Sequence, residues 1–145
     1  MSDNTAIHRD TFWLMCGNRI GSGMSRVAYT CEFNSDWVIK VEDRAQSFQN
    51  VREWEAWQWV KDHPEARWFA PCLHISPNGS VLIQRRTITP RPKEFMDRMP
   101  VFLGDFKRQN YGMLDGKLVC HDYGTNMLME HGRSQKMRKV EWWDE

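Results

Sequence analysis

The chain has 145 residues, 41% of them hydrophobic, and a formal net charge of +1 at pH 7, so its overall charge gives no general attraction to nucleic acid or acidic membranes. This length predicts one globular domain, and eight tryptophans predict a core rich in aromatic side chains. No apolar run approaches the ~20 residues that span a bilayer, so we expect no membrane partner.

The first half of the chain has the pattern of an antiparallel sheet interrupted by one helix. Runs of apolar, β-branched and aromatic residues bounded by turn signals predict five strands. The predicted strands cover 11–20, 26–33, 36–42, 72–76 and 80–88. Between the third and fourth strands, over 45–61, apolar side chains recur at spacings of three or four and predict an amphipathic helix.

The second half is less regular. The stretch 89–100 is rich in proline and can hold only a short helix. The stretch 111–121 predicts a β-hairpin that turns at Asp115-Gly116, and 130–145 predicts a short basic helix with an aromatic and acidic tail. Four cysteines without a Cys-x-x-Cys pair favour reduced thiols, as in a cytoplasm, over disulfides or a zinc site.

Three features of the first half could serve a phosphorylated ligand. Gly21-Ser22-Gly23 lies between two strands, where glycines let backbone N–H groups approach phosphate oxygens, although such a sequence is commonly just a turn. Lys40 lies in an apolar strand, where it either reaches solvent or meets an anion in a cleft. Glu53 and Glu55 on the following helix could both pair with Lys40, and Glu53 has the better spacing.

A second set of polar residues flanks the predicted hairpin. Asp105, Lys107 and Asn110 fit the pattern D-x-K-x-x-N just before it, and Asp122-Tyr123-Gly124 follows it. The hairpin would bring Asn110 and Asp122 close together. Two oxygen ligands of this kind suit Mg²⁺, which is usually shared with substrate phosphates.

The order of these motifs resembles that of protein-kinase-like phosphotransferases, from about residue 17 to 125. The resemblance implies an α+β, protein-kinase-like fold over 1–145, with a five-stranded antiparallel N-lobe carrying one main helix (11–88) and a much reduced C-lobe carrying the catalytic hairpin (89–145). It also implies ATP and Mg²⁺ as cofactors.

The resemblance assigns a role to each motif residue. Lys40 would contact the α- and β-phosphates and pair with Glu53, under a glycine loop formed by Gly21, Ser22 and Gly23. Asp105 would orient or deprotonate the acceptor hydroxyl. The remaining implied roles are phosphoryl stabilisation by Lys107, metal binding by Asn110 and Asp122, and recognition of adenine by backbone groups of Gln84, Arg85 and Arg86.

Several departures from the family pattern leave two functional classes open. Arg26 replaces the third glycine of the loop, Gly104 precedes Asp105 where an arginine is usual, and most of the helical lobe is missing. The first class is a minimal serine/threonine protein kinase or a small-molecule kinase. The second is a pseudokinase-like nucleotide-binding or interaction module that inhibits or docks on a partner without catalysis.

The partners that we expect follow from the same resemblance. A protein substrate or target is favoured, and a homo-oligomer could cover apolar surface that the reduced lobe leaves exposed. A nucleic-acid partner has little support beyond Arg85, Arg86 and the basic stretch after residue 130. The small size resembles that of kinase-like proteins of bacteriophages and bacteria, which implies a bacterial cytoplasm.

Overall fold

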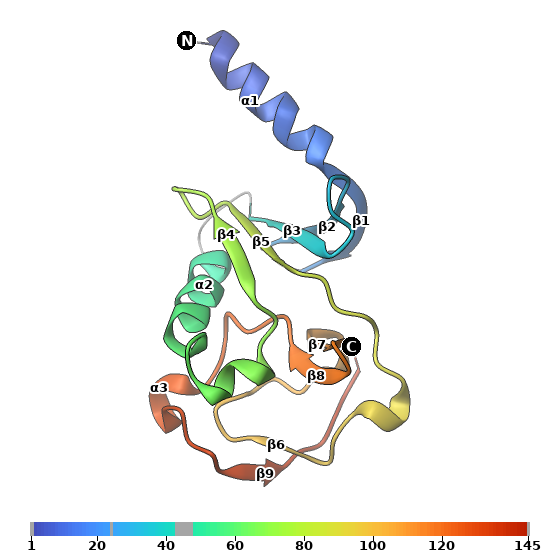
Figure 1. The fold of residues 1–145 in the computed structure, drawn as a ribbon, viewed down its shortest axis with the longest axis vertical. Helices are drawn as coiled ribbons and strands as arrows, with labels where there is room; N and C mark the ends of the chain where they lie inside the picture. Colours follow the sequence, from blue (N-terminus) through green and yellow to red (C-terminus); the bar gives the residue numbers. More distant parts are fainter. Residues whose placement is uncertain (1, 24, 43–47, 145) are drawn as a thin grey trace.

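A five-stranded antiparallel sheet forms the first half of the molecule. We analysed a computed structural model, which describes residues 2–23, 25–42 and 48–144, with the backbone alone for 2–8. The strand order is β1-β2-β3-β5-β4, as Figure 1 shows. The strands are β1 (Cys16–Ser22), β2 (Val27–Cys31), β3 (Trp37–Val41), β4 (Cys72–Ile75) and β5 (Val81–Arg85). The expected α+β class with this sheet is confirmed.

Helix α2 (Gln49–Val60) follows β3 and packs against the sheet. Glu42, directly after β3, caps the start of this helix. Its buried carboxylate accepts hydrogen bonds from the amides of Gln49 at 3.1 Å and Asn50 at 3.0 Å. The buried residues of the helix are Asn50, Glu53, Ala56 and Val60, whereas most of the predicted apolar face, including Trp54, is only partly buried. Residues 45–47 of the predicted helix lie outside the described residues.

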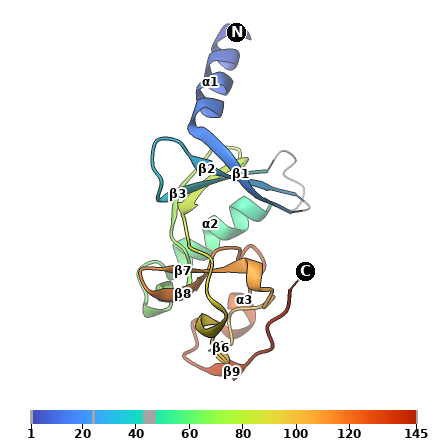
Figure 2. The same ribbon diagram turned by 90° about the vertical axis from the view of Figure 1, so that its right-hand side faces the viewer.

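The prediction of a strand from residue 11 is wrong for its first part. Helix α1 (Ser2–Met15) runs to the start of β1 and projects beyond the sheet in both views (Figure 1 and Figure 2). Phe12 and Met15, about one helical turn apart, pack against the cluster of Cys31, Ile39 and Val41. In a strand these two side chains would point to opposite faces of the sheet, so the tertiary contact favours the helix.

The predicted hairpin is present. Strands β7 (Tyr111–Leu114) and β8 (Lys117–Cys120) pair in antiparallel register. Asp115 and Gly116 join them with φ values of 51° and 77°, the left-handed pair that a tight two-residue turn needs.

The helix predicted over 130–145 is wrong. Helix α3 (Leu128–His131) ends at Gly132, whose φ of 61° stops the helical ladder, and the chain then forms strand β9 (Met137–Lys139). This strand pairs with β6 (Arg98–Pro100), so its residues find backbone partners that the local sequence does not reveal. The remaining elements are three short 3₁₀ turns, Pro64–Trp68 (η1), Pro92–Glu94 (η2) and Arg108–Asn110 (η3).

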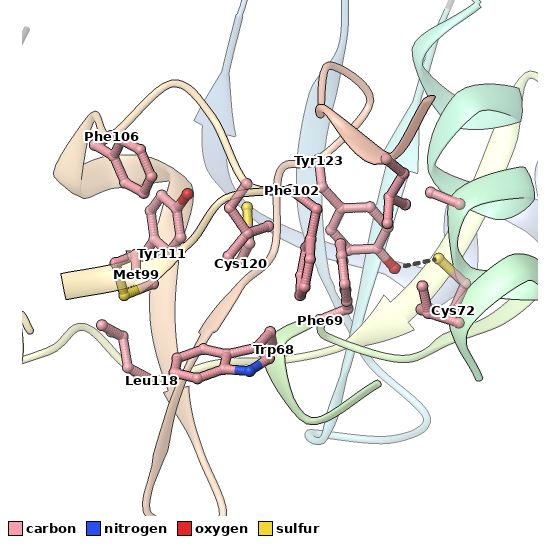
Figure 3. Close-up of a cluster of buried hydrophobic side chains, with 14 of the residues drawn as sticks. Trp68, Phe69, Cys72, Met99, Phe102, Phe106, Tyr111, Leu118, Cys120 and Tyr123 are labelled. Atoms are coloured by element: carbon pink, nitrogen blue, oxygen red, sulfur yellow. Dashed lines mark hydrogen bonds between the residues drawn. The ribbon is translucent and has the colours of Figure 1, made fainter. Parts of the chain in front are cut away.

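The main core joins both halves of the chain. Phe69, which follows η1, stacks on Phe102 with ring centroids 5.7 Å apart and meets Tyr123 edge-on at 4.9 Å (Figure 3). Only some tryptophans belong to this core: Trp68 is 8% exposed, whereas Trp13 is 46% and Trp59 38% exposed. Within the described part of the chain, helices are too short or too polar to cross a bilayer.

Candidate functional site

A cleft of about 1370 Å³ contains nearly all of the predicted site residues. Its lining comes from the loop between β1 and β2, the inner face of β3, the end of β5 and the segments that flank the β7–β8 hairpin. The predicted residues that line it are Gly21, Ser22, Gly23, Lys40, Gln84, Arg85, Arg86, Asp105, Lys107, Asn110 and Asp122. The sequence therefore brings its two sets of polar residues to one place.

Lys40 pairs with Glu53 beneath this cleft. The Lys40 Nζ lies 2.8 Å from Glu53 Oε1, and the two residues are 6% and 0% exposed. Glu55 is exposed on the outer face of α2, so the choice between the two glutamates is settled in favour of Glu53. The ammonium also donates to the backbone carbonyl of His121, which ties β3 to the segment after β8.

The second carboxylate oxygen of Glu53 holds the segment 122–124. The backbone N–H groups of Tyr123 and Gly124 donate to Glu53 Oε2 at 3.1 and 3.2 Å. A Cβ at Gly124 would lie 2.0 Å from Gln49 Oε1 and 3.3 Å from the Gln49 backbone oxygen, so a side chain there would force Gln49 to shift. The Asp-x-Gly motif is thus anchored to α2 through its backbone.

Tyr123 anchors the same motif from below. Its hydroxyl donates to the Ala70 carbonyl at 2.7 Å and lies 3.1 Å from Cys72 Sγ, in the buried cluster of Figure 3. Burial raises the pKa of the Tyr123 hydroxyl well above its ordinary value and that of the Cys72 thiol to about 11. These groups are therefore neutral structural contacts at neutral pH.

Asp122, a predicted metal ligand, contacts Arg26. Burial alone would raise the pKa of the Asp122 carboxyl, but the positive charges of Lys40 and Arg26 outweigh burial and lower this pKa to about 2. The Arg26 Nη2 donates to Asp122 Oδ1 and, at 2.5 Å, to Glu53 Oε2, while Nη1 donates to Asn50 Oδ1 at 3.0 Å. In the sequence, Arg26 stands out only as a departure from the glycine pattern, and no local signal places it among the site residues.

Asp105 and Asn110 form a second polar pair at the cleft. The Asn110 side-chain amide donates to the backbone carbonyl of Asp105 at 3.2 Å and to its carboxylate at 3.0 Å. Asp105 is exposed and has a φ of 48°, a left-handed backbone conformation that is uncommon for residues other than glycine. Because the amide nitrogen of Asn110 faces Asp105, its amide oxygen is the atom left to face a ligand.

Asn110 and Asp122 lie at the two ends of the hairpin, as predicted. The His121 amide donates to the Asn110 carbonyl at 2.9 Å, one step beyond the last β7–β8 pair. An amide oxygen and a carboxylate fit Mg²⁺ when phosphates and water supply the other ligands. Among the residues that the structure describes, His, Cys, Asp and Glu side chains do not gather in threes as a self-sufficient metal cage would require.

His121 is held as a neutral ring beside this pair. Its Nε2 lies 2.7 Å from the Gln109 carbonyl, which can only accept, so Nε2 carries the proton and Nδ1 accepts from the Thr87 hydroxyl at 2.8 Å. Burial and the Lys40 ammonium both lower the pKa of His121, in agreement with this assignment.

The C-terminal segment lies against the part of the cleft that Lys107 and Arg108 line. Trp143 forms a parallel bridge with Lys107, whose Nζ lies 5.8 Å from the centre of the indole ring, and Asp144 pairs with Arg108 at 2.7 Å. The sequence analysis missed this contact, because nothing in the local pattern after residue 140 indicates pairing with residues near 107.

The predicted nucleotide contacts at the glycine loop and at the end of β5 differ in what the structure leaves available to a ligand. A Cβ added at Gly21 or Gly23 would meet nothing within 4 Å, so these two glycines leave space over the cleft. At the end of β5, the amides of Arg85 and Arg86 already donate to the carbonyls of Pro71 at 2.9 Å and Asp36 at 2.6 Å. Only carbonyl groups and later residues of that segment remain for contact with a base.

The cleft suits a polyanion. Its charged lining has six arginines and lysines, namely Arg26, Lys40, Arg85, Arg86, Lys107 and Arg108. It has three carboxylates, namely Asp105, Asp122 and Asp144. The excess of basic side chains favours anions, while Arg26 and Lys40 also pair with Glu53, and Arg108 pairs with Asp144.

Comparison of the chain with models of known protein families and with curated protein sequences gave no match.

Proposed function

We propose that the chain is a Mg-ATP-dependent phosphotransferase of protein-kinase-like fold, and that its acceptor is a serine or threonine hydroxyl of a protein. One observation carries the proposal: Lys40, which pairs with the buried Glu53 at 2.8 Å, lines the same cleft as Asp122. Burial of the Lys40–Glu53 ion pair costs desolvation free energy. A Lys40 ammonium fixed in this way would be positioned to bind nucleotide phosphates.

The nucleotide side of the proposal uses residues of both halves. Glu53 fixes the Lys40 ammonium, which would donate to the α- and β-phosphates. Asn110 and Asp122 would hold Mg²⁺, which neutralises phosphate charge when it is bound. Gly21 and Gly23 line the same cleft, so the phosphates would lie beside them.

The acceptor side centres on Asp105. Its exposed carboxylate, steadied by Asn110 at 3.0 Å, would accept the proton of the attacking hydroxyl. A new bond then forms between that hydroxyl oxygen and the γ-phosphorus, the bond to the β–γ bridging oxygen breaks, and ADP leaves with the electron pair. Lys107, at the rim of the cleft, would stabilise the charge of the transferred group.

The test is transfer of label from γ-labelled ATP to the chain itself and to a mixture of generic hydroxyl-bearing protein substrates. Asp105→Asn should lower the rate by about 10²- to 10⁴-fold. Asp115→Asn is the matched control, because Asp115 is also an exposed aspartate with positive φ, at 51°, and does not line the cleft. Equal rates for the two variants would refute the catalytic assignment.

The contact between Arg26 and Asp122 favours a second candidate function, a binding module without catalysis. A chain whose metal ligand is already paired with an arginine could bind a nucleotide, or a partner protein, without transferring phosphate. A thermal shift with ATP, with and without Mg²⁺, separates the two functions. Stabilisation by about 2.7 kcal/mol at 100 times the dissociation constant, combined with no label transfer, would favour the binding module.

A further inference from the structure

Arg26 makes contacts that the proposed chemistry does not use. Its guanidinium is bound by two residues of α2, Asn50 and Glu53, and by Asp122 from the second half of the chain. The Arg26 side chain is 10% exposed, whereas that of Asp122 is 44% exposed. The Arg26 guanidinium is therefore a largely buried cation, and Asp122 is its solvent-exposed partner.

The contact with Asp122 involves the carboxylate that a divalent cation would need. An arginine cannot give up its charge at any ordinary pH, so the pair does not dissolve by deprotonation. Two cations that share one carboxylate oxygen at van der Waals distance repel each other in a partly buried site. A divalent cation at either oxygen of the Asp122 carboxylate is therefore repelled by the guanidinium, and this repulsion weakens the contact between Arg26 and Asp122.

The other two contacts of Arg26 do not have to break. Nη1 is held by Asn50 at 3.0 Å, and one N–H of Nη2 is held by Glu53 at 2.5 Å. Asn50 is itself fixed, because its side-chain amide donates to the carbonyls of Lys40 at 3.1 Å and Gly79 at 3.0 Å. The guanidinium would therefore stay on α2 while the N–H that Asp122 releases faces the cleft.

We propose that Arg26 and a divalent cation compete for Asp122, and that the released N–H of Arg26 becomes a donor to a phosphate oxygen of the nucleotide. Arg26 is then a determinant of metal affinity and a phosphate ligand of the loaded site. The part that concerns phosphate rests on the proposed function, whereas the competition for Asp122 concerns the metal alone.

The competition can be measured without nucleotide. Free Mn²⁺, which substitutes for Mg²⁺ and is detected by electron paramagnetic resonance, is titrated with the wild-type chain and with Arg26→Met. We expect Mn²⁺ to bind about tenfold more tightly to the variant, because a half-exposed ion pair no longer opposes it. Arg19→Met removes an equal charge from the exposed strand β1, outside the contacts of Asp122, and should leave the affinity within about twofold of wild type.

A double variant identifies the carboxylate. If the gain occurs at Asp122, then Arg26→Met/Asp122→Asn should lose it. Equal Mn²⁺ affinity of wild type and Arg26→Met overturns the proposal, and so does a gain that persists in the double variant. Should Arg26→Met fail to fold, Arg26→Gln keeps a donor for Asn50 and the same outcomes apply.

The phosphate contact has its own readout. A non-hydrolysable ATP analogue saturated with Mn²⁺ should bind about tenfold more weakly to Arg26→Met, even though Mn²⁺ alone binds more tightly. Unchanged analogue affinity removes the phosphate contact and leaves the competition intact. If no form of the chain binds the analogue, the proposed function fails, while the Mn²⁺ titration still decides the competition.

Discussion

Replacement of Glu53 by glutamine should lower the unfolding free energy of the chain strongly. The carboxylate accepts from Lys40 Nζ and Arg26 Nη2, and from the amides of Tyr123 and Gly124, and it is fully buried. All of these partners are donors. A glutamine side chain presents one N–H₂ group in place of an acceptor and removes the charge that balances two cations.

The magnitude follows from the loss of one member of a buried ion pair. Such a loss typically costs about 3–5 kcal/mol, because the remaining charge is left without a counter-charge away from water. A domain of this size has about 5–15 kcal/mol of unfolding free energy in total. Glu53→Gln should therefore move the urea midpoint far down, or leave the chain partly unfolded in buffer.

The assay is urea unfolding followed by tryptophan fluorescence, with Glu55→Gln as the matched control. Glu55 lies two residues away on the same helix and is exposed, so its substitution should change the unfolding free energy by less than about 0.5 kcal/mol. A cost for Glu53→Gln below about 1 kcal/mol, or equal costs for the two variants, would show that the carboxylate is not the centre of this network.

Three further outcomes are expected. Tyr123→Phe removes the hydroxyl that donates to the Ala70 carbonyl at 2.7 Å and should lower the unfolding free energy by about 1–2 kcal/mol, measured by urea titration. Gly124→Ala places a Cβ 2.0 Å from Gln49 Oε1 and should cost about 1–3 kcal/mol in the same titration, although shortening that side chain by Gln49→Ala should recover part of the loss. The Cys72 thiol is buried, and burial raises its pKa to about 11, so only about one molecule in a thousand carries the thiolate at pH 8; its alkylation in the folded chain, followed by mass spectrometry, should be much slower than in the urea-unfolded chain at the same pH.

Each of these outcomes has a result that would contradict it. An unchanged midpoint for Tyr123→Phe would mean that water satisfies the freed carbonyl. A cost for Gly104→Ala as large as that for Gly124→Ala would refute the steric argument, because a Cβ at Gly104 meets Met127 only at 3.7 Å. Fast alkylation of Cys72 at pH 8, in a chain that remains folded, would exclude a buried neutral thiol.

The sequence was most informative where the signal is local. The turn at Asp115-Gly116 needs residues that adopt positive φ, and that requirement alone placed the β7–β8 hairpin and brought Asn110 near Asp122. The pairing of Lys40 with Glu53 was predictable for a similar reason. A strand residue with its side chain on the covered face and a helix residue 13 positions later meet when the helix packs on that face.

The sequence was least informative where distant segments decide the structure. Residues 11–15 have strand-forming side chains, yet Phe12 and Met15 find a surface to pack on only when the segment is helical. Strand β9 forms because it pairs with β6, and no sequence pattern within 130–145 predicts that pairing. Arg26 was visible as a departure from a glycine pattern, but its contacts with α2 and Asp122 depend on the whole assembly.

The hydrogen bonds from Tyr123 and Gly124 to Glu53 join amides of the second half of the chain to a side chain of the first. Neither half can supply both partners, so a partially folded state with only one half formed would lack these bonds. The two amide protons should therefore exchange with deuterium only through global opening, at the same slow rate as the amides of β3, and should serve as probes of whether the chain behaves as a single cooperative unit.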